Sequence, residues 1–156
     1  METFTAIHVI ISLIAIIAGL VVLVAMLSNQ DLSRLTAIFL IFTIATSVTG
    51  FFFPLQGFTP AIGVGIISVV LLAIAVVARY VGHTRSFWRW LYIVTALMSL
   101  YLNCFVLVVQ LFQKVPALKA IAPTQTEPPF AATQLIVLIT FIVLTVITLI
   151  RFRPNR

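Results

Sequence analysis

The sequence predicts an all-α integral membrane protein, folded as a compact bundle of five transmembrane helices. Of its 156 residues, 63% are hydrophobic and 8% are charged, whereas a soluble domain is about half apolar and about a quarter charged. The apolar residues form five runs of about 20 residues, the length that crosses a ~30 Å hydrocarbon core. Backbone amides in lipid need partners within their own segment, and none of the runs alternates apolar with polar residues as a barrel strand would. The runs are therefore predicted to be helices.

One transmembrane domain is expected, with spans over residues 4–27, 34–53, 60–80, 87–113 and 130–150. The first span is too long for the apolar region of a signal peptide and has no basic segment before it, so we expect it to be retained. Asp31 or Ser33 is the expected cap of the second helix, and Pro54 stops that helix. Thr59 followed by Pro60 predicts the start of the third helix, as a cap and a first-turn proline.

The connection over residues 114–129 is the longest segment outside the spans, and four of its residues are prolines. A connection of this length is longer than neighbouring helices need, and the prolines make it stiff. We expect it either to cover the bundle or meet a partner, or to serve as a plain tether.

The basic residues predict the orientation of the bundle. Five spans place seven Lys and Arg residues on the face that holds the C-terminus, and two, Lys114 and Lys119, on the face that holds the N-terminus. Cytoplasmic loops carry the excess of basic residues. We therefore expect the N-terminus outside and the C-terminus in the cytoplasm.

Small and hydroxyl residues recur at helical spacing in every span. Close packing replaces the hydrophobic effect between helices in lipid, so these stripes predict the faces where helices meet. On the fourth span the stripe also carries polar side chains, and it comprises Tyr92, Ala96, Ser99, Asn103, Val106, Gln110 and Gln113. The other stripes are His8, Ser12, Ala15 and Gly19; Thr36, Thr43, Thr46 or Ser47 and Gly50; Ala61, Gly65, Ser68 and Ala75; and Thr133, Thr140 and Thr148.

Five polar side chains in the middle or outer half of the spans are the candidate ligand-binding residues: His8, Ser12, Asn103, Gln110 and Gln113. An unpaired amide near mid-membrane costs several kcal/mol, so Asn103 must bond to something. The alternative to a ligand is an interhelical hydrogen bond, worth about 1 kcal/mol. If a pocket exists, we expect it between the first and fourth helices, under the connection 114–129.

Aromatic and basic residues cluster around the start of the fourth span: Arg79, Arg85, Trp88, Arg89, Trp90 and Tyr92. Trp and Tyr favour the headgroup level of a membrane, and Arg reaches to lipid phosphate. The cluster is predicted to anchor the bundle at the membrane interface. The alternative is a site for a specific anionic ligand.

No catalytic residue, cofactor or metal site is predicted. The spans contain no Asp or Glu, which argues against a proton-coupled carrier or ion pump, whose pathway ordinarily holds a buried carboxylate. Cys104 and two histidines on opposite faces, His8 and His83, supply too few ligands for a metal site or a bis-histidine haem. The net charge is +6, and the basic residues that cause it lie between and beyond the spans, where they indicate topology. Nucleic acid is therefore not an expected partner.

The segment from Tyr101 to Phe130, YLNCFVLVVQLFQKVPALKAIAPTQTEPPF, resembles part of a family of small uncharacterised bacterial inner-membrane proteins. The resemblance implies a bacterial cytoplasmic-membrane setting and no particular activity.

Two functions fit these features. The first is a non-catalytic polytopic inner-membrane subunit or accessory protein, surrounded by membrane lipids within a larger complex or a homo-oligomer. The second is a binding or transport module for a neutral or lipidic small molecule in the outer half of the bundle. An enzyme would need a borrowed cofactor.

Cysteine labelling in intact cells tests the orientation. In a Cys104→Ala background, a membrane-impermeant thiol reagent should modify a cysteine placed at Thr124 and leave one placed at Thr84 unmodified. The reverse pattern would place the N-terminus in the cytoplasm.

Overall fold

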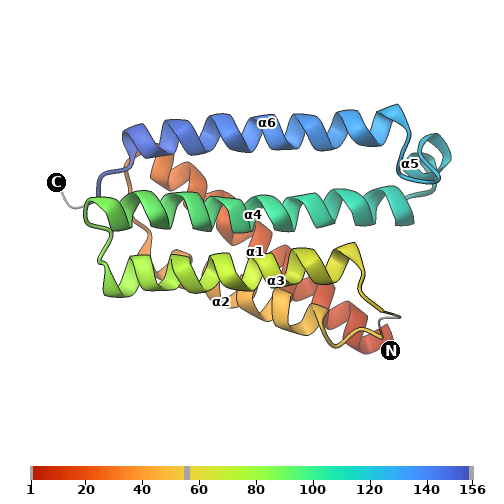
Figure 1. Cartoon of the computed structure of the whole chain (residues 1–156), viewed down its shortest axis with the longest axis horizontal. Helices are drawn as coiled ribbons and strands as arrows, with labels where there is room; N and C mark the ends of the chain where they lie inside the picture. Colours follow the sequence, from red (N-terminus) through yellow and green to blue (C-terminus); the bar gives the residue numbers. More distant parts are fainter. Residues whose placement is uncertain (1, 55–56, 155–156) are drawn as a thin grey trace.

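The computed structural model describes residues 2–54 and 57–154, and the described chain folds into helices without strands (Figure 1). The five long helices are α1 (Glu2–Leu27), α2 (Ser33–Gly50), α3 (Pro60–Val76), α4 (Phe87–Lys114) and α6 (Pro128–Arg151). A five-residue π-helix, η1 (Val77–Val81), continues α3, and a short helix, α5 (Pro116–Ile121), follows α4. With η1 counted as part of α3, all five long helices are long and apolar enough to span a membrane. The prediction of five such helices is therefore confirmed.

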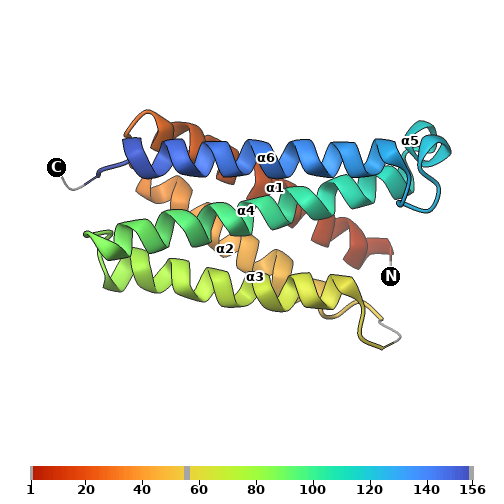
Figure 2. The same cartoon turned by 45° about the horizontal axis from the view of Figure 1, so that its top comes forward.

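The bundle is elongated, and its two ends differ (Figure 1). One end holds the N-terminus, the α2–α3 connection and α5, and we call it the N-terminal end. The other, the C-terminal end, holds the α1–α2 turn, the α3–α4 turn and the C-terminus. α1 crosses the bundle diagonally behind α3 and α4. Figure 2 shows α4 tilting towards α6 and away from α3 as it approaches the N-terminal end.

The apolar core lies in the half of the bundle nearer the C-terminal end. Its largest fully buried apolar side chains are Met26, Phe39, Leu40, Leu72, Tyr92, Ile93, Leu97, Leu100 and Phe152. Every long helix except α6 supplies at least one of them, and Phe152 directly follows α6. The C-terminal half therefore supplies most of the packing that holds the helices together.

The stripe predicted as the inner face of the fourth helix is inside over part of its length. Tyr92 and Ser99 are buried, as expected, but Val106, Gln110 and Gln113 are exposed. The exposed part of the stripe lies in the half of α4 that diverges from α3.

Gly19 permits the close approach of α1 to α2 and α4. A Cβ atom added at Gly19 would lie 2.6 Å from Leu100 Cδ1 and 2.9 Å from the Phe39 ring. Both side chains are almost fully buried, with exposed fractions of 0% and 1%, so neither has room to move. Ala15 is also fully buried, which confirms this part of the small-residue stripe on α1.

Hydroxyl side chains on the stripes bond to their own helices. The hydroxyls of Thr43, Ser47, Ser99 and Thr148 donate to the carbonyl four residues earlier, at 2.7–3.0 Å. This bonding satisfies the hydroxyl without a partner helix. Two other predicted stripe residues, Ala61 and Thr140, are exposed. These four hydroxyls therefore need no partner on another helix, whereas the Thr49 hydroxyl contacts His8 of α1 at 2.7 Å.

The second helix ends three residues earlier than predicted, at Gly50. Leaving the helix here turns the Phe53 ring towards α1, where its centroid lies 5.1 Å from that of Phe4 and 5.0 Å from that of His8. Aromatic contact between the chain segments has replaced the last turn of the expected helix.

The predicted helix caps divide into one success and one error. Thr59 caps α3 by accepting from the Ile62 amide at 3.4 Å, as predicted. No side chain caps α2, whose N-cap residue is Leu32. The two expected caps, Asp31 and Ser33, instead bind an arginine of the following hairpin, described below.

The α3–α4 turn refines the labelling experiment. Thr84 is buried, with an exposed fraction of 6%, whereas Ser86 in the same turn is exposed. A cysteine at Ser86 is therefore the better probe of this side of the membrane.

Replacing Gly19 with alanine should destabilise the bundle, because the new methyl group meets Leu100 and Phe39. Overpacking of this kind costs about 1–3 kcal/mol. Gly63→Ala is the matched control, since a Cβ there would lie an ordinary 3.6 Å from Phe58 Cζ. Thermal unfolding in detergent should show a lower midpoint for Gly19→Ala alone. Equal midpoints would contradict close packing at Gly19.

Candidate functional site

The His8 side chain contacts α2 and the residues that follow it. Its Nδ1 lies 2.7 Å from Thr49 Oγ1, and its ring meets Phe53 edge-on. The Thr49 hydroxyl already donates to the Ala45 carbonyl at 2.7 Å, so His8 Nδ1 must be the donor to Thr49. The His8 ring is thus held by its neighbouring helix.

The other predicted ligand-binding residues do not converge on His8. Ser12 donates to the His8 carbonyl at 2.8 Å, while Gln113 Nε2 contacts Gln125 Oε1 at 3.4 Å. Asn103 Nδ2 is buried without a partner, and Gln110 is exposed. Among the described residues, no hydrogen bond joins the α1 pair to the three amides of α4. Direct contacts therefore do not build the pocket expected between these two helices.

A different polar pair lies on α4 and α6. Gln134, with an exposed fraction of 9%, donates from Nε2 to the Phe105 carbonyl at 3.2 Å. Its Oε1 is buried without a partner, as is Asn103 Nδ2. These are the two buried side-chain atoms without a hydrogen-bond partner among the described residues. Sequence reasoning missed Gln134, although it is the single amide residue in the last predicted span.

The connection between α4 and α6 folds onto the end of α4. Gln125 Nε2 donates to the Val109 carbonyl at 2.9 Å. Glu127 organises the rest, because its carboxylate accepts from the Thr124 and Thr126 amides at 3.2 and 3.1 Å. Desolvation raises the pKa of Glu127, but these hydrogen bonds and that of the Thr124 hydroxyl lower it below its ordinary value overall. The segment is a built structure rather than a slack tether.

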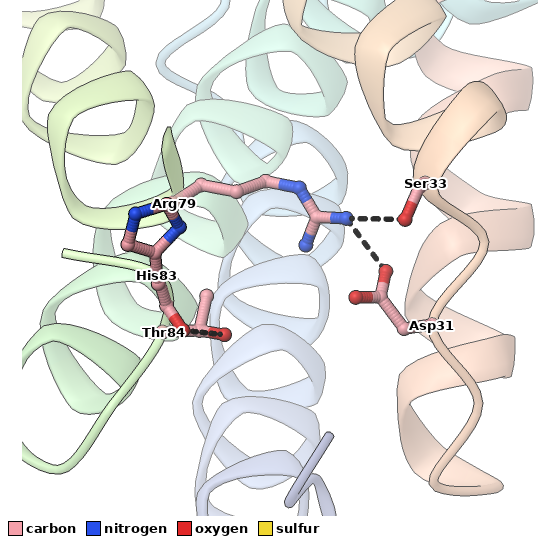
Figure 3. Close-up of polar contacts among 5 residues, drawn as sticks. All are labelled: Asp31, Ser33, Arg79, His83 and Thr84. Carbon is pink, nitrogen blue, oxygen red and sulfur yellow. Dashed lines mark hydrogen bonds and ion pairs between the residues drawn. The ribbon is translucent and has the colours of Figure 1, made fainter. Parts of the chain in front are cut away.

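An ion pair joins two turns at the C-terminal end (Figure 3). Arg79 Nη2 donates to Asp31 Oδ1 at 2.6 Å and to Ser33 Oγ at 3.2 Å. The arginine comes from η1 and its two acceptors from the α1–α2 turn and the start of α2. The exposed fraction is 7% for the Arg79 side chain and 31% for Asp31. This contact links the first helical hairpin to the third helix.

Burial of Arg79 and Tyr92 corrects two of the predicted interface anchors. The Arg79 guanidinium lies 5.3 Å from the centroid of the Tyr92 ring, and Tyr92 itself is 1% exposed. Arg79 continues the buried side of α3 that includes Leu72 and Ala75, four residues after Ala75. The sequence held a signal for this pair. The buried stripe of α3 runs into Arg79, and Asp31 is the single acidic residue predicted on the same side of the membrane.

The C-terminal end holds further cross-links. Arg89 Nη1 donates to the carbonyls of Leu149 and Phe152, both at 2.9 Å, and so caps the end of α6. Asn29 Oδ1 accepts from the Arg153 amide at 2.7 Å. Asn29 also ends α1 in a left-handed conformation, with a φ of 57°, as residues just past a helix often do. The turns and the tail therefore form one connected layer.

The remaining predicted anchors are exposed at the same end. Trp88 and Trp90 have exposed fractions of 39% and 46%, and Arg85 is also exposed. Their position suits contact with lipid headgroups. Arg89 does not share this role, since its guanidinium serves α6.

Known proteins provide no guide to this arrangement. The chain matches no family model, no curated protein and no solved structure. The described residues also hold no group of three or more His, Cys, Asp or Glu side chains that would suit a metal ion.

Asp31→Asn should destabilise the bundle, because it leaves the Arg79 charge buried without its counter-charge. Breaking a fully buried pair costs about 3–5 kcal/mol, and exposed pairs contribute about 0–1 kcal/mol. Since Asp31 is partly exposed, we expect an intermediate loss of about 1–2 kcal/mol. Unfolding in detergent should show this loss for Asp31→Asn and none for Glu2→Gln, which removes an exposed carboxylate.

A double variant separates the ion pair from a general effect of the Asp31 substitution. Arg79→Met added to Asp31→Asn removes the stranded charge and should recover part of the lost stability. No recovery would contradict a direct pairing of these two charges.

Proposed function

We propose that this chain is a non-catalytic subunit of a membrane-protein complex in the bacterial cytoplasmic membrane, with its N-terminus outside. A partner helix packs on the half of α4 and α6 nearer the N-terminal end. The distribution of Lys and Arg supports the orientation. The resemblance of residues 101–130 to bacterial inner-membrane proteins supports the location.

The exposed amide of Gln110 carries the proposal. It lies one turn before the end of α4 and has no hydrogen-bond partner among the described residues. Amide groups facing hydrocarbon find partners on neighbouring helices. A helix from a partner protein or a second copy would supply one.

The exposure of α6 supports the same surface. In the most apolar 18-residue stretch of α6, 6% of the residues are buried, whereas the corresponding share is 44% in α1 and in α4. Gln134, Phe141 and Thr148 are its buried residues, so the helix is attached along one narrow stripe. The rest of α6, next to the second half of α4, is available to a partner.

The buried Asn103 and Gln134 atoms favour a second candidate, a binding module for a neutral or lipidic molecule. Asn103 Nδ2 can donate to a ligand oxygen, and Gln134 Oε1 can accept from a ligand hydroxyl; both atoms are buried without partners. This candidate needs the ligand to insert between α4 and α6 rather than under the connection 114–129.

Gentle extraction followed by native mass spectrometry tests the subunit proposal. The chain should leave the membrane with a stoichiometric partner or as a homo-oligomer. Gln110→Leu should weaken this association about five-fold, because an interhelical hydrogen bond is worth about 1 kcal/mol. The thermal unfolding of the isolated chain should not change.

Thr140→Val is the matched control for Gln110→Leu. Its hydroxyl is exposed at the middle of α6, just outside the half that forms the proposed surface, and is satisfied by the Ile136 carbonyl at 2.7 Å, so the association should be unaffected. A monomer carrying a bound lipid or quinone would instead favour the second candidate. Asn103→Leu should then release that molecule.

A further inference from the structure

An open groove between α3, η1 and α4 lies near the C-terminal end. It has a volume of about 310 Å³ and is lined by Ala73, Ile74, Val77, Trp88 and Leu91. All five side chains are apolar or aromatic, and the volume falls at the lower end of the range for small-ligand sites, about 300–1,000 Å³. Ala73 provides the space, because a larger side chain at this exposed position would project into the groove.

The aromatic wall of the groove is held in place by Gly82. A Cβ atom added at Gly82 would lie 2.2 Å from Trp88 Cγ, so the indole rests directly on the glycine backbone. The Trp88 ring also meets the Phe87 ring, with 6.2 Å between centroids. The wall therefore has a defined position and is not a freely rotating side chain.

Two sources of positive charge directly precede Trp88 in the chain. Trp88 donates its amide to the Arg85 carbonyl at 2.9 Å, which places exposed Arg85 one turn from the groove. No side chain caps the N-terminus of α4, where backbone amides carry partial positive charge. Asp31 is the single carboxylate among the described residues of this end, and Arg79 already neutralises it.

We propose that this groove binds an anionic phospholipid, with one acyl chain against Ala73 and Trp88 and the phosphate beside Arg85. The apolar lining suits a hydrocarbon chain, and the positive charge of Arg85 and of the start of α4 suits an anionic headgroup. The phosphate chemistry is shared with free phosphate, but the groove makes lipid the source. The proposal concerns a different surface from the partner site on α4 and α6, and it holds for either orientation of the bundle.

The two tryptophans of the chain supply matched reporters for this site. Trp90→Phe leaves Trp88 in the groove wall. Trp88→Phe leaves Trp90 at a similar level but about 200° around α4, since each residue turns the helix by about 100°. Each variant is reconstituted in phosphatidylcholine vesicles with a minority of phosphatidylglycerol. Fluorescence quenching is then measured with bromine on the acyl chains of one lipid or the other.

Trp88 should be quenched about five-fold more strongly per molecule by brominated phosphatidylglycerol than by brominated phosphatidylcholine, which is the preference expected from one arginine near a lipid surface. Trp90 should show a smaller preference. In the Trp88 reporter, Arg85→Gln should remove most of the preference. Arg34→Gln, which removes an exposed arginine at the same end, should leave it unchanged.

The shape of the groove is tested with a second pair of variants. Ala73→Leu should reduce quenching of Trp88 by both brominated lipids, while Ala61→Leu, an exposed alanine at the other end of α3, should not. An equal preference at Trp88 and Trp90, or equal effects of Arg85→Gln and Arg34→Gln, would overturn the proposal. Loss of the preference in inorganic phosphate, but not in chloride of the same ionic strength, would show a phosphate site instead of a lipid site.

Discussion

Polar groups inside a hydrocarbon layer must find partners within the protein, and this constraint shapes the whole bundle. The backbone meets it by forming helices. The hydroxyls of Thr43 and Ser99 meet it by bonding to their own helices, and the buried charge of Arg79 meets it through Asp31. Because the hydroxyls are satisfied within their own helices, the packing of those faces depends on shape. Gly19 shows this most directly, because α2 and α4 side chains occupy the space that a larger residue would fill.

The two ends of the bundle meet the constraint to different degrees. At the C-terminal end, Arg79, Arg89 and Asn29 connect the turns and the tail through short hydrogen bonds. Towards the N-terminal end, α4 diverges from α3 and its amide Gln110 remains exposed. The cross-links are thus concentrated at one end of the long axis. The proposed partner surface lies on the other halves of α4 and α6.

Three arginines of one sequence neighbourhood have three different tasks. Arg79 points into the protein and pairs with Asp31, Arg89 caps α6, and Arg85 is exposed in the α3–α4 turn. The rule that relates basic residues to the cytoplasmic side counts all three alike. Their separate roles follow from the π-helix that carries Arg79 and from the turn that places Arg89 under the end of α6.

The sequence by itself determined the helical class, the number of spans and their limits to within about three residues. These are local properties, since apolar length and internal backbone bonding belong to each segment alone. The Thr59 cap was predictable for the same reason. The tertiary structure alone decided which parts of the stripes are inside, because the tilt of α4 depends on all its neighbours. It also decided the bonds of Arg79 and Gln134, which join residues 48 and 29 positions apart that spacing along one helix cannot bring together.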